Sequence, residues 1–246
     1  MRKIIRKKIS KNIWLILIGT ILLLIIINFP FLLLILVLFL IFFFRRGKRK
    51  EDELKKICRD FYQGQKFVAI DLETTGLNPR KDEIIEIAAI KFDKNGKGDS
   101  FVKFIRPRGY VPFEIQEMLG IPISKIMEEG KPFREIQGEF ISFVGNSPIL
   151  GWNLSFDLDF LRNNGIELLN PTIDVMKLAQ DLLPSEIYKK GRRRRVRRRF
   201  YLLSIARDLG IYIRDIQRAG SHAFLCGKIF EKLMEQLKYK YFRENI

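Results

Sequence analysis

Hydrophobic and polar positions divide the chain into two unlike parts, and an apolar run dominates the first. Residues 13–44 carry no charged side chain, and only Gly19, Thr20, Asn28 and Pro30 interrupt the run. A helix on the surface of a soluble domain needs a polar face, which this run lacks. The run is also longer than the roughly 20 helical residues that cross the hydrocarbon core of a bilayer. The pattern therefore predicts a membrane segment that contacts the lipid bilayer through residues 13–44.

The charges that flank this run favour one arrangement of it. Pro30 disfavours helical geometry at the preceding residue, so the run forms either a hairpin of two short helices or one helix that is tilted or kinked there. Six basic residues precede the run, and five follow it within residues 45–50. Positive residues prefer the cytoplasmic side, so a transmembrane helical hairpin with both ends inside suits both flanks. We expect residues 1–50 to anchor the chain in the inner (cytoplasmic) membrane, with the catalytic domain facing the cytoplasm.

The rest of the chain has the pattern of a mixed α/β domain over residues 66–240. Apolar residues at helical spacing in residues 51–65 predict a short linker helix before it. Three strands separated by short turns are expected to pair antiparallel, over residues 66–72, 83–92 and 99–106. A short strand at residues 148–151 follows, with helices from Phe133 onward and over residues 155–163, 174–183, 200–209 and 222–239. Ser155 is expected to be the N-cap of its helix.

Two acidic residues end the first of these strands. The apolar residues 67–70 lead directly into Asp71-Leu72-Glu73. Side chains alternate along a strand, so both carboxylates lie on the same face. They repel each other unless a cation lies between them, and hard oxygen ligands suit Mg²⁺ or Mn²⁺. The pair therefore predicts a metal site.

Two further segments add to this pair. Residues 153–161 read Asn-Leu-Ser-Phe-Asp-Leu-Asp-Phe-Leu, and His222 is the only histidine among 246 residues. With Asp-Leu-Glu-Thr-Thr-Gly at residues 71–76, they resemble the motifs of the DnaQ-like 3′–5′ exonucleases of the DEDDh type, over residues 66–238. The resemblance implies a ribonuclease H-like exonuclease domain, in which helices flank a mixed sheet.

The same resemblance assigns roles to residues. It implies hydrolysis of nucleic-acid phosphodiesters at a single-stranded 3′ end by two Mg²⁺ or Mn²⁺ ions, with a polymerase as an expected partner. Asp71, Glu73 and Asp157 would bind the ions, and His222, which has a suitable ordinary pKa, would accept a proton from water. The nucleic-acid contacts would include Thr74, Thr75, Gly76, Asn153 and Phe156.

Two positions depart from the family pattern: Trp152 precedes Asn153 where the family usually has His, and Gly227 replaces an acid. The family carries a metal-binding Asp five residues after the His, where this chain has Gly227. Glycine supplies no ligand, so the loss of this acid lowers the expected metal affinity or rate. The alternative function is therefore a catalytically impaired relative that only binds nucleic acid.

Strong positive charge points to anionic partners. The formal charge is +17, and residues 191–199 contain seven arginines: Arg192, Arg193, Arg194, Arg195, Arg197, Arg198 and Arg199. Such a run repels itself and needs anions or solvent around it. We expect a clamp for nucleic-acid phosphates. The alternatives are adhesion to anionic lipid, as in a membrane-surface scaffold, and a solvated loop. Cys58 and Cys226 lack metal-ligand spacing and are expected to be reduced thiols.

Overall fold

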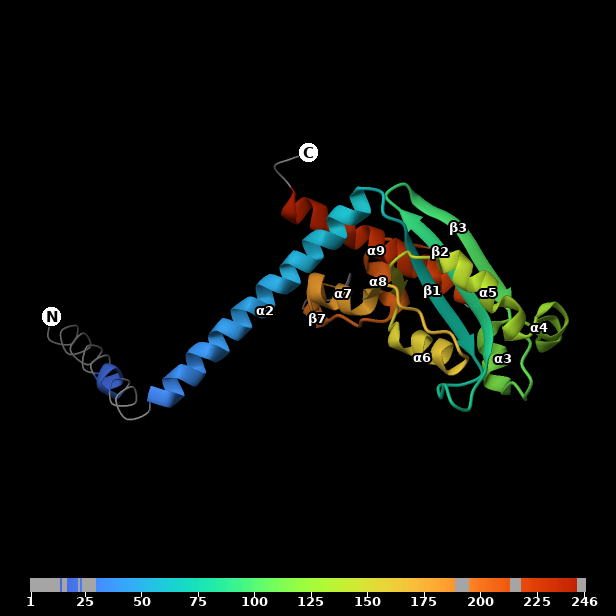
Figure 1. The fold of residues 1–246 in the computed structure, drawn as a ribbon, viewed down its shortest axis with the longest axis horizontal. Coiled ribbons are helices and arrows are strands. Elements are labelled where there is room, and N and C mark those ends of the chain that lie inside the picture. The colour runs from blue at the N-terminus through green and yellow to red at the C-terminus, as the bar shows by residue number, and fades with distance from the viewer. Residues whose placement is uncertain are drawn as a thin grey trace. The chain divides into compact units, whose positions relative to one another are not determined.

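The computed structural model describes residues 14, 17–21, 23, 30–188, 195–212 and 218–242 (Figure 1). Two compact units divide at Lys55, one over Met1–Lys55 and the other over Lys56–Ile246. The second unit contains the sheet and all helices from α3 onward. It therefore contains every residue of the predicted metal site.

Helix α2 runs without a break from Pro30 to Tyr62. Proline suits the first turn of a helix, where its missing N–H has no partner to lose. The helix predicted over residues 51–65 is the end of α2, and its apolar beginning is exposed, from Phe31 at 72% to Phe44 at 74%. The predicted turn or kink at Asn28-Phe29-Pro30 falls largely outside the described residues, because 24–29 are not described and Pro30 begins α2. Within the part of the chain that the structure describes, no helix is both long and apolar enough to span a bilayer.

A five-stranded mixed sheet forms the centre of the second unit. The strands are β1 (Phe67–Thr74), β2 (Ile84–Asp93), β3 (Gly96–Phe104), β4 (Ile149–Gly151) and β5 (Thr172–Asp174), in the order β3-β2-β1-β4-β5. β1 and β2 pair antiparallel, as do β2 and β3, whereas β4 pairs parallel with both β1 and β5. The mixed sheet and its three antiparallel strands confirm the prediction from the sequence.

Five of the helices match predicted segments: α5 (Phe133–Val144), α6 (Ser155–Asn163), α7 (Val175–Leu182), α8 (Leu202–Asp208) and α9 (Ala219–Tyr241). Two others were not predicted, α3 (Phe113–Leu119) and α4 (Ile123–Glu129), each of only seven residues. The expected N-cap of α6 was wrong, because Ser155 is the first helical residue and Leu154 precedes it without a side-chain cap. A separate hairpin contains β6 (Glu186–Tyr188) and β7 (Arg195–Arg197).

Alternate residues of β1 face opposite sides of the sheet. Val68 and Ile70 pack with the α5 and α6 residues Phe140 and Phe160 in one core cluster. On the other face, Phe67 contacts Phe230 of α9, with ring centroids 5.0 Å apart. Figure 1 shows α5 in front of the sheet and α9 behind it. Asp71 and Glu73 share the parity of Phe67, so β1 directs both carboxylates toward α9.

The last turns of α2 belong to this same core. Phe61 is buried and meets Phe230 edge-on, with ring centroids 5.5 Å apart. The buried Cys58 thiol lies 3.7 Å from the carbonyl oxygen of Met234. Both contacts join the end of α2 to α9, the helix that carries His222.

Candidate active site

The predicted metal pair meets the chain's one histidine. Nδ1 of His222 lies 3.4 Å from Oδ2 of Asp71 and 3.4 Å from Oε1 of Glu73. One ligand atom from each of these three residues lies within 4.8 Å of the others. Because α9 begins at Ala219, the histidine is in its first turn, where the helix passes the end of β1. The structure thus brings together residues far apart in the sequence.

Asp157 lies close to this group and contacts the backbone of β1. It is near the start of α6 and only 3% exposed, and its Oδ1 accepts a hydrogen bond of 3.0 Å from the backbone N–H of Leu72. Asn153, just before α6, has a φ of 61°, a left-handed conformation that asparagine tolerates better than most residues. This turn lets α6 begin directly beside the acidic end of β1.

A third acidic residue of the sheet was missed from the sequence. Glu86 is 1% exposed on β2 and pairs in register with Glu73. Its Oε1 accepts hydrogen bonds from Nη2 of Arg218 at 2.6 Å and from Nε at 3.1 Å, and its Oε2 accepts one from the N–H of Ala219 at 3.1 Å. A single acid inside the apolar stretch of residues 84–90 was the signal that could have revealed it. Glu86 fixes the start of α9 next to the site.

Crowding of these acids shifts their proton affinities. Burial, and secondly the charge of Glu86, raises the pKa of Asp71 well above its usual range. Burial and the charge of Asp71 raise the pKa of Glu73 to about 8, although His222 opposes the shift. Burial and Asp71 likewise raise the pKa of Asp157. Shifts of this kind mark carboxylates that lack a counter-charge and are typical of functional sites.

These residues fit a divalent cation. The donor atoms are mostly carboxylate oxygens, which Mg²⁺ and Mn²⁺ prefer, with one imidazole nitrogen. A cation between Asp71 and Glu73 would favour the charged form of both carboxylates and so oppose the burial and the neighbouring charges that raise their pKa values. The ligand chemistry and the electrostatics of the cluster therefore agree.

The position at which the family carries its fourth acid, Gly227, packs against the sheet. Position 227 lies about 140° around the helix from His222, and a Cβ built on Gly227 would be 2.1 Å from Cε2 of Phe92. Gly227 therefore faces β2, where no larger side chain fits. Cys226 lies about 40° from His222 and one turn further along, and it is buried. Burial, and secondly the charges of Asp71, Asp157 and Asp174, raise the pKa of its thiol, so Cys226 is the residue on the acidic side of α9.

The residues expected to touch nucleic acid around β1 and α6 have structural contacts of their own. The Thr74 hydroxyl donates to the carbonyl oxygen of Gly76 at 2.6 Å, and the Thr75 hydroxyl accepts from the N–H of Glu83 at 2.9 Å. The ring of Phe156 lies 4.9 Å from that of Phe160 and packs against the core. These residues shape the end of β1 and the start of α6.

The arginine-rich segment is described only in part. Residues 189–194, including Arg192, Arg193 and Arg194, lie outside the described residues. Arg195 begins β7, and Arg197 and Arg199 are exposed. Arg198 differs, because its Nε lies 3.2 Å from Oδ2 of Asp208. That ion pair ties the β7 strand to α8.

Comparison with known proteins is consistent with this site. The model of the exonuclease family RNase_T matches residues 68–201, more than half of the chain. The chain is 29% identical over 181 residues to DNA polymerase III subunit epsilon of Aquifex aeolicus, with 71% of this chain and 83% of that protein covered. It is 33% identical over 180 residues to the PolC-type DNA polymerase III of Clostridium perfringens, with 70% of this chain covered. It spans only 12% of that PolC protein's length.

Solved structures share the fold. Escherichia coli exonuclease I in complex with a dT13 oligonucleotide aligns with a TM-score of 0.58 at 20% identity, over 73% of this chain and 43% of that one. Exonuclease X in complex with duplex DNA aligns with a TM-score of 0.50 at 18% identity, over 72% and 93% of the two chains. The sheet order, the cluster at the end of β1 and the family match agree, and the chain belongs to the RNase_T exonuclease family.

Proposed function

We propose that this protein is a 3′–5′ exonuclease that hydrolyses phosphodiesters at a single-stranded 3′ end with two Mg²⁺ or Mn²⁺ ions. The observation that carries the proposal is the convergence of Asp71, Glu73, Asp157 and His222 at the end of β1. One sequence relative and one structural neighbour support the 3′–5′ direction of hydrolysis and the nucleic-acid substrate. The chain is 30% identical over 181 residues to the 3′–5′ exonuclease DinG of Bacillus subtilis, of which it covers 18%. The structural neighbour exonuclease I was solved in complex with a dT13 oligonucleotide.

Each residue has a distinct task in this mechanism. Asp71, Glu73 and Asp157 would hold the ions, which when bound neutralise charge at the phosphate and acidify the attacking water. His222 is 30% exposed, so water can reach its imidazole, and a neutral imidazole can accept the proton that the water loses. Glu86 and Arg218 hold the first turn of α9, and thereby His222, against β1.

Release of nucleotides from a 3′-labelled single strand by the full-length chain, with Mg²⁺ or Mn²⁺, tests the proposal. Asp71→Ala should abolish release. Asp159→Ala is the matched control, because Asp159 is on α6 but is exposed and pairs with Arg162 at 2.7 Å. The proposal is wrong if the wild-type chain releases nothing, or if release survives Asp71→Ala.

A relative that binds nucleic acid without cutting it is the second candidate. The observation that favours it is Gly227, which stands where the family pattern calls for a metal-binding acid and supplies no ligand. Such a protein would bind the labelled strand in the same assay and leave it intact with either ion.

We further propose that the exonuclease is tethered to the cytoplasmic membrane. The uncharged run of residues 13–44 and its basic flanks support the tether. The exposed apolar side chains of α2 between Phe31 and Phe44 support it as well, since a large uncovered apolar surface marks a site of association. The relatives that belong to DNA polymerase III suggest a polymerase as a partner of the tethered enzyme.

A further inference from the structure

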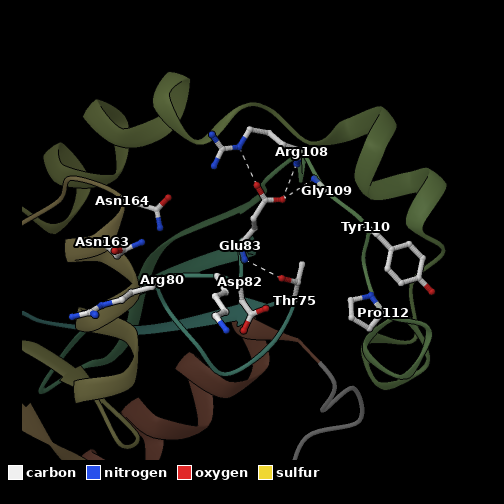
Figure 2. A pocket seen from close by; sticks show the side chains of 11 residues that line it. Thr75, Arg80, Asp82, Glu83, Arg108, Gly109, Tyr110, Pro112, Asn163 and Asn164 are labelled. Carbon is white, nitrogen blue, oxygen red and sulfur yellow. Dashed lines mark hydrogen bonds and ion pairs between the residues drawn. The ribbon is translucent and has the colours of Figure 1, made fainter.

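A polar pocket lies beside the acidic end of β1, and of the site residues assigned above only Thr75 lines it. Its volume is about 530 Å³, within the usual range for small-molecule sites. Its lining includes Thr75, Arg80 and Lys81 from the β1–β2 connection, Arg108 and Tyr110 from the segment after β3, and Asn164 after α6 (Figure 2). Thr75 follows Glu73 by two residues, so the pocket begins about 7 Å along the strand from the proposed metal site.

The two acids of the pocket are held by groups around them. The Glu83 carboxylate accepts hydrogen bonds from Nε of Arg108 at 2.9 Å, from the Arg108 N–H at 2.8 Å and from the Gly109 N–H at 3.0 Å. Burial pushes the pKa of Glu83 up, but these bonds outweigh it and the pKa lies below its usual range. Oδ2 of Asp82 accepts from the N–H of Asn78 at 2.8 Å. Glu83 is therefore paired with Arg108, and Asp82 is held by the backbone of the same connection.

Arg80 and Lys81 are the other cations of the pocket. Both side chains are exposed, and within the ranges that the structure describes neither has an acidic partner at ion-pair distance. Figure 2 shows the Arg80 and Arg108 guanidinium groups extending toward the side of the pocket formed by Asn163 and Asn164. This side offers positive charge and amide groups, which suit a phosphate.

The opposite side of the pocket is aromatic. Tyr110 and Pro112 lie there in Figure 2, and Tyr110 is 79% exposed. An open aromatic face stacks on any nucleic-acid base, because every base has a π-face. The pocket thus offers a cationic side and a stacking side, matching the two halves of a nucleotide.

We infer that this pocket binds one nucleotide unit of the substrate strand, with its phosphate on Arg80 and Lys81 and its base on Tyr110. The inference rests on the proposed function, because it extends the contact with the strand beyond the metal site. It adds a subsite that uses neither the metal ligands nor the arginine-rich segment.

Binding of a fluorescent single-stranded oligonucleotide to the full-length chain, in detergent with EDTA, tests the subsite without hydrolysis. Arg80→Gln with Lys81→Gln removes the one phosphate contact and should reduce the slope of log affinity against log salt by about 0.7, the contribution of one phosphate contact on a single strand. Lys97→Gln with Arg134→Gln removes the same charge from outside the pocket and should leave the slope near the wild-type value. Equal slopes for the two double variants overturn the inference.

Tyr110→Ala gives an independent measurement. Affinity should fall roughly tenfold at every salt concentration, because stacking is not a charge interaction, and Tyr110→Phe should restore it. If the affinity of Tyr110→Ala equals that of the wild-type chain, a base does not stack on Tyr110.

Two further outcomes separate related ideas. If the Arg80/Lys81 variant loses binding of free nucleoside monophosphate but binds the strand like wild type, the pocket is a mononucleotide site and the assignment to the strand is wrong. If the pocket variants weaken strand binding as expected, yet the wild-type chain releases no nucleotides with Mg²⁺ or Mn²⁺, the subsite stands and the proposed hydrolysis fails.

Discussion

The side chains that α9 presents to β1 determine what the site can do. His222 lies beside the carboxylates, Cys226 is buried one turn further on, where burial and the charges of Asp71 and Asp157 raise the pKa of its thiol, and Gly227 accommodates the ring of Phe92. A motif that counts five residues from the histidine selects Gly227, but helix geometry selects the residue four positions on. The distinction requires the position of Phe92, which no sequence pattern supplies.

Cys226→Asp should therefore strengthen metal binding. Aspartate is similar in size to cysteine and would add an oxygen ligand on the acidic side of α9. We expect the variant to be less stable without metal, because it buries one more carboxylate, and to gain more than wild type in melting temperature when Mn²⁺ is added. Melting curves with and without Mn²⁺, together with turnover of a labelled strand, measure this. An unchanged Mn²⁺ shift would mean that the side chain at 226 does not reach the ion.

Gly227→Asp provides the contrast. Its Cβ would overlap Phe92, and overpacking a core costs about 1–3 kcal/mol, before the cost of burying the new carboxylate. Chemical denaturation should show lower stability for this variant, with no gain in Mn²⁺ affinity. A stable variant with tighter Mn²⁺ binding would reverse the assignment of 226 and 227.

Glu73 should make the metal-free protein less stable as the pH rises. Its pKa is about 8 in the folded chain against an ordinary value of 4.5, so between these values the folded state holds a proton that the unfolded state has lost. The contribution of Glu73 to stability is complete below about pH 4.5 and declines until about pH 8. Urea denaturation in EDTA across this range should show a weaker decline for Glu73→Gln than for wild type. The surface variant Glu135→Gln should lose stability with rising pH as the wild-type chain does. If Glu73→Gln shows the same loss as wild type, the pKa of Glu73 is not raised in the folded chain.

At the scale of elements, the longer segments were predicted most closely, although the three-residue β4 was also found from its apolar run. β1, β2 and α6 are long enough for apolar periodicity to show, and their predicted bounds agree with the structure within a few residues. β5, β6 and β7 have only three residues each, too few to establish a period. The acidic pair and His222 could be found from motifs. The role of Glu86, the side of α9 on which Cys226 lies and the pocket could not be predicted. Each of them depends on how β2, α9 and the connecting segments pack together.

The last turn of α2 should contribute strongly to stability of the exonuclease unit. Phe61 is buried against Phe67 and Phe230, and truncation of a buried phenylalanine costs about 3–5 kcal/mol. Phe61→Ala should lower the free energy of unfolding by that order in chemical denaturation. Lys56→Ala, at an exposed position of the same helix, should change it little. A small effect of Phe61→Ala would show that α2 does not form part of this core in solution.

The arginine-rich segment should give strand binding part of its salt dependence. Replacing Arg192–Arg195, Arg197 and Arg199 by Ser, while keeping Arg198 for its pair with Asp208, preserves the tie to α8. Each lost phosphate contact should lower the log–log slope by about 0.7. If the slope for nucleic acid is unchanged but binding to anionic vesicles falls, the segment serves lipid instead.

At the scale of the whole molecule, the apolar beginning of the chain should hold the enzyme at the membrane. Alkaline carbonate should leave the full-length protein in the membrane fraction, because the uncharged residues 13–44 would remain in the hydrocarbon. Residue 246 should be protected from an impermeant label applied from outside. Release by carbonate contradicts the tether, and outside labelling contradicts the orientation.

Because the chain has a single histidine, the ring of that residue can serve as a spectroscopic probe of the site. His222 is the only imidazole in the chain, and it lies 3.4 Å from both Asp71 and Glu73. Its ring protons would therefore give isolated resonances in a proton spectrum, without isotope labelling and without assignment. Broadening of those resonances by Mn²⁺ would show directly that the ion binds beside His222.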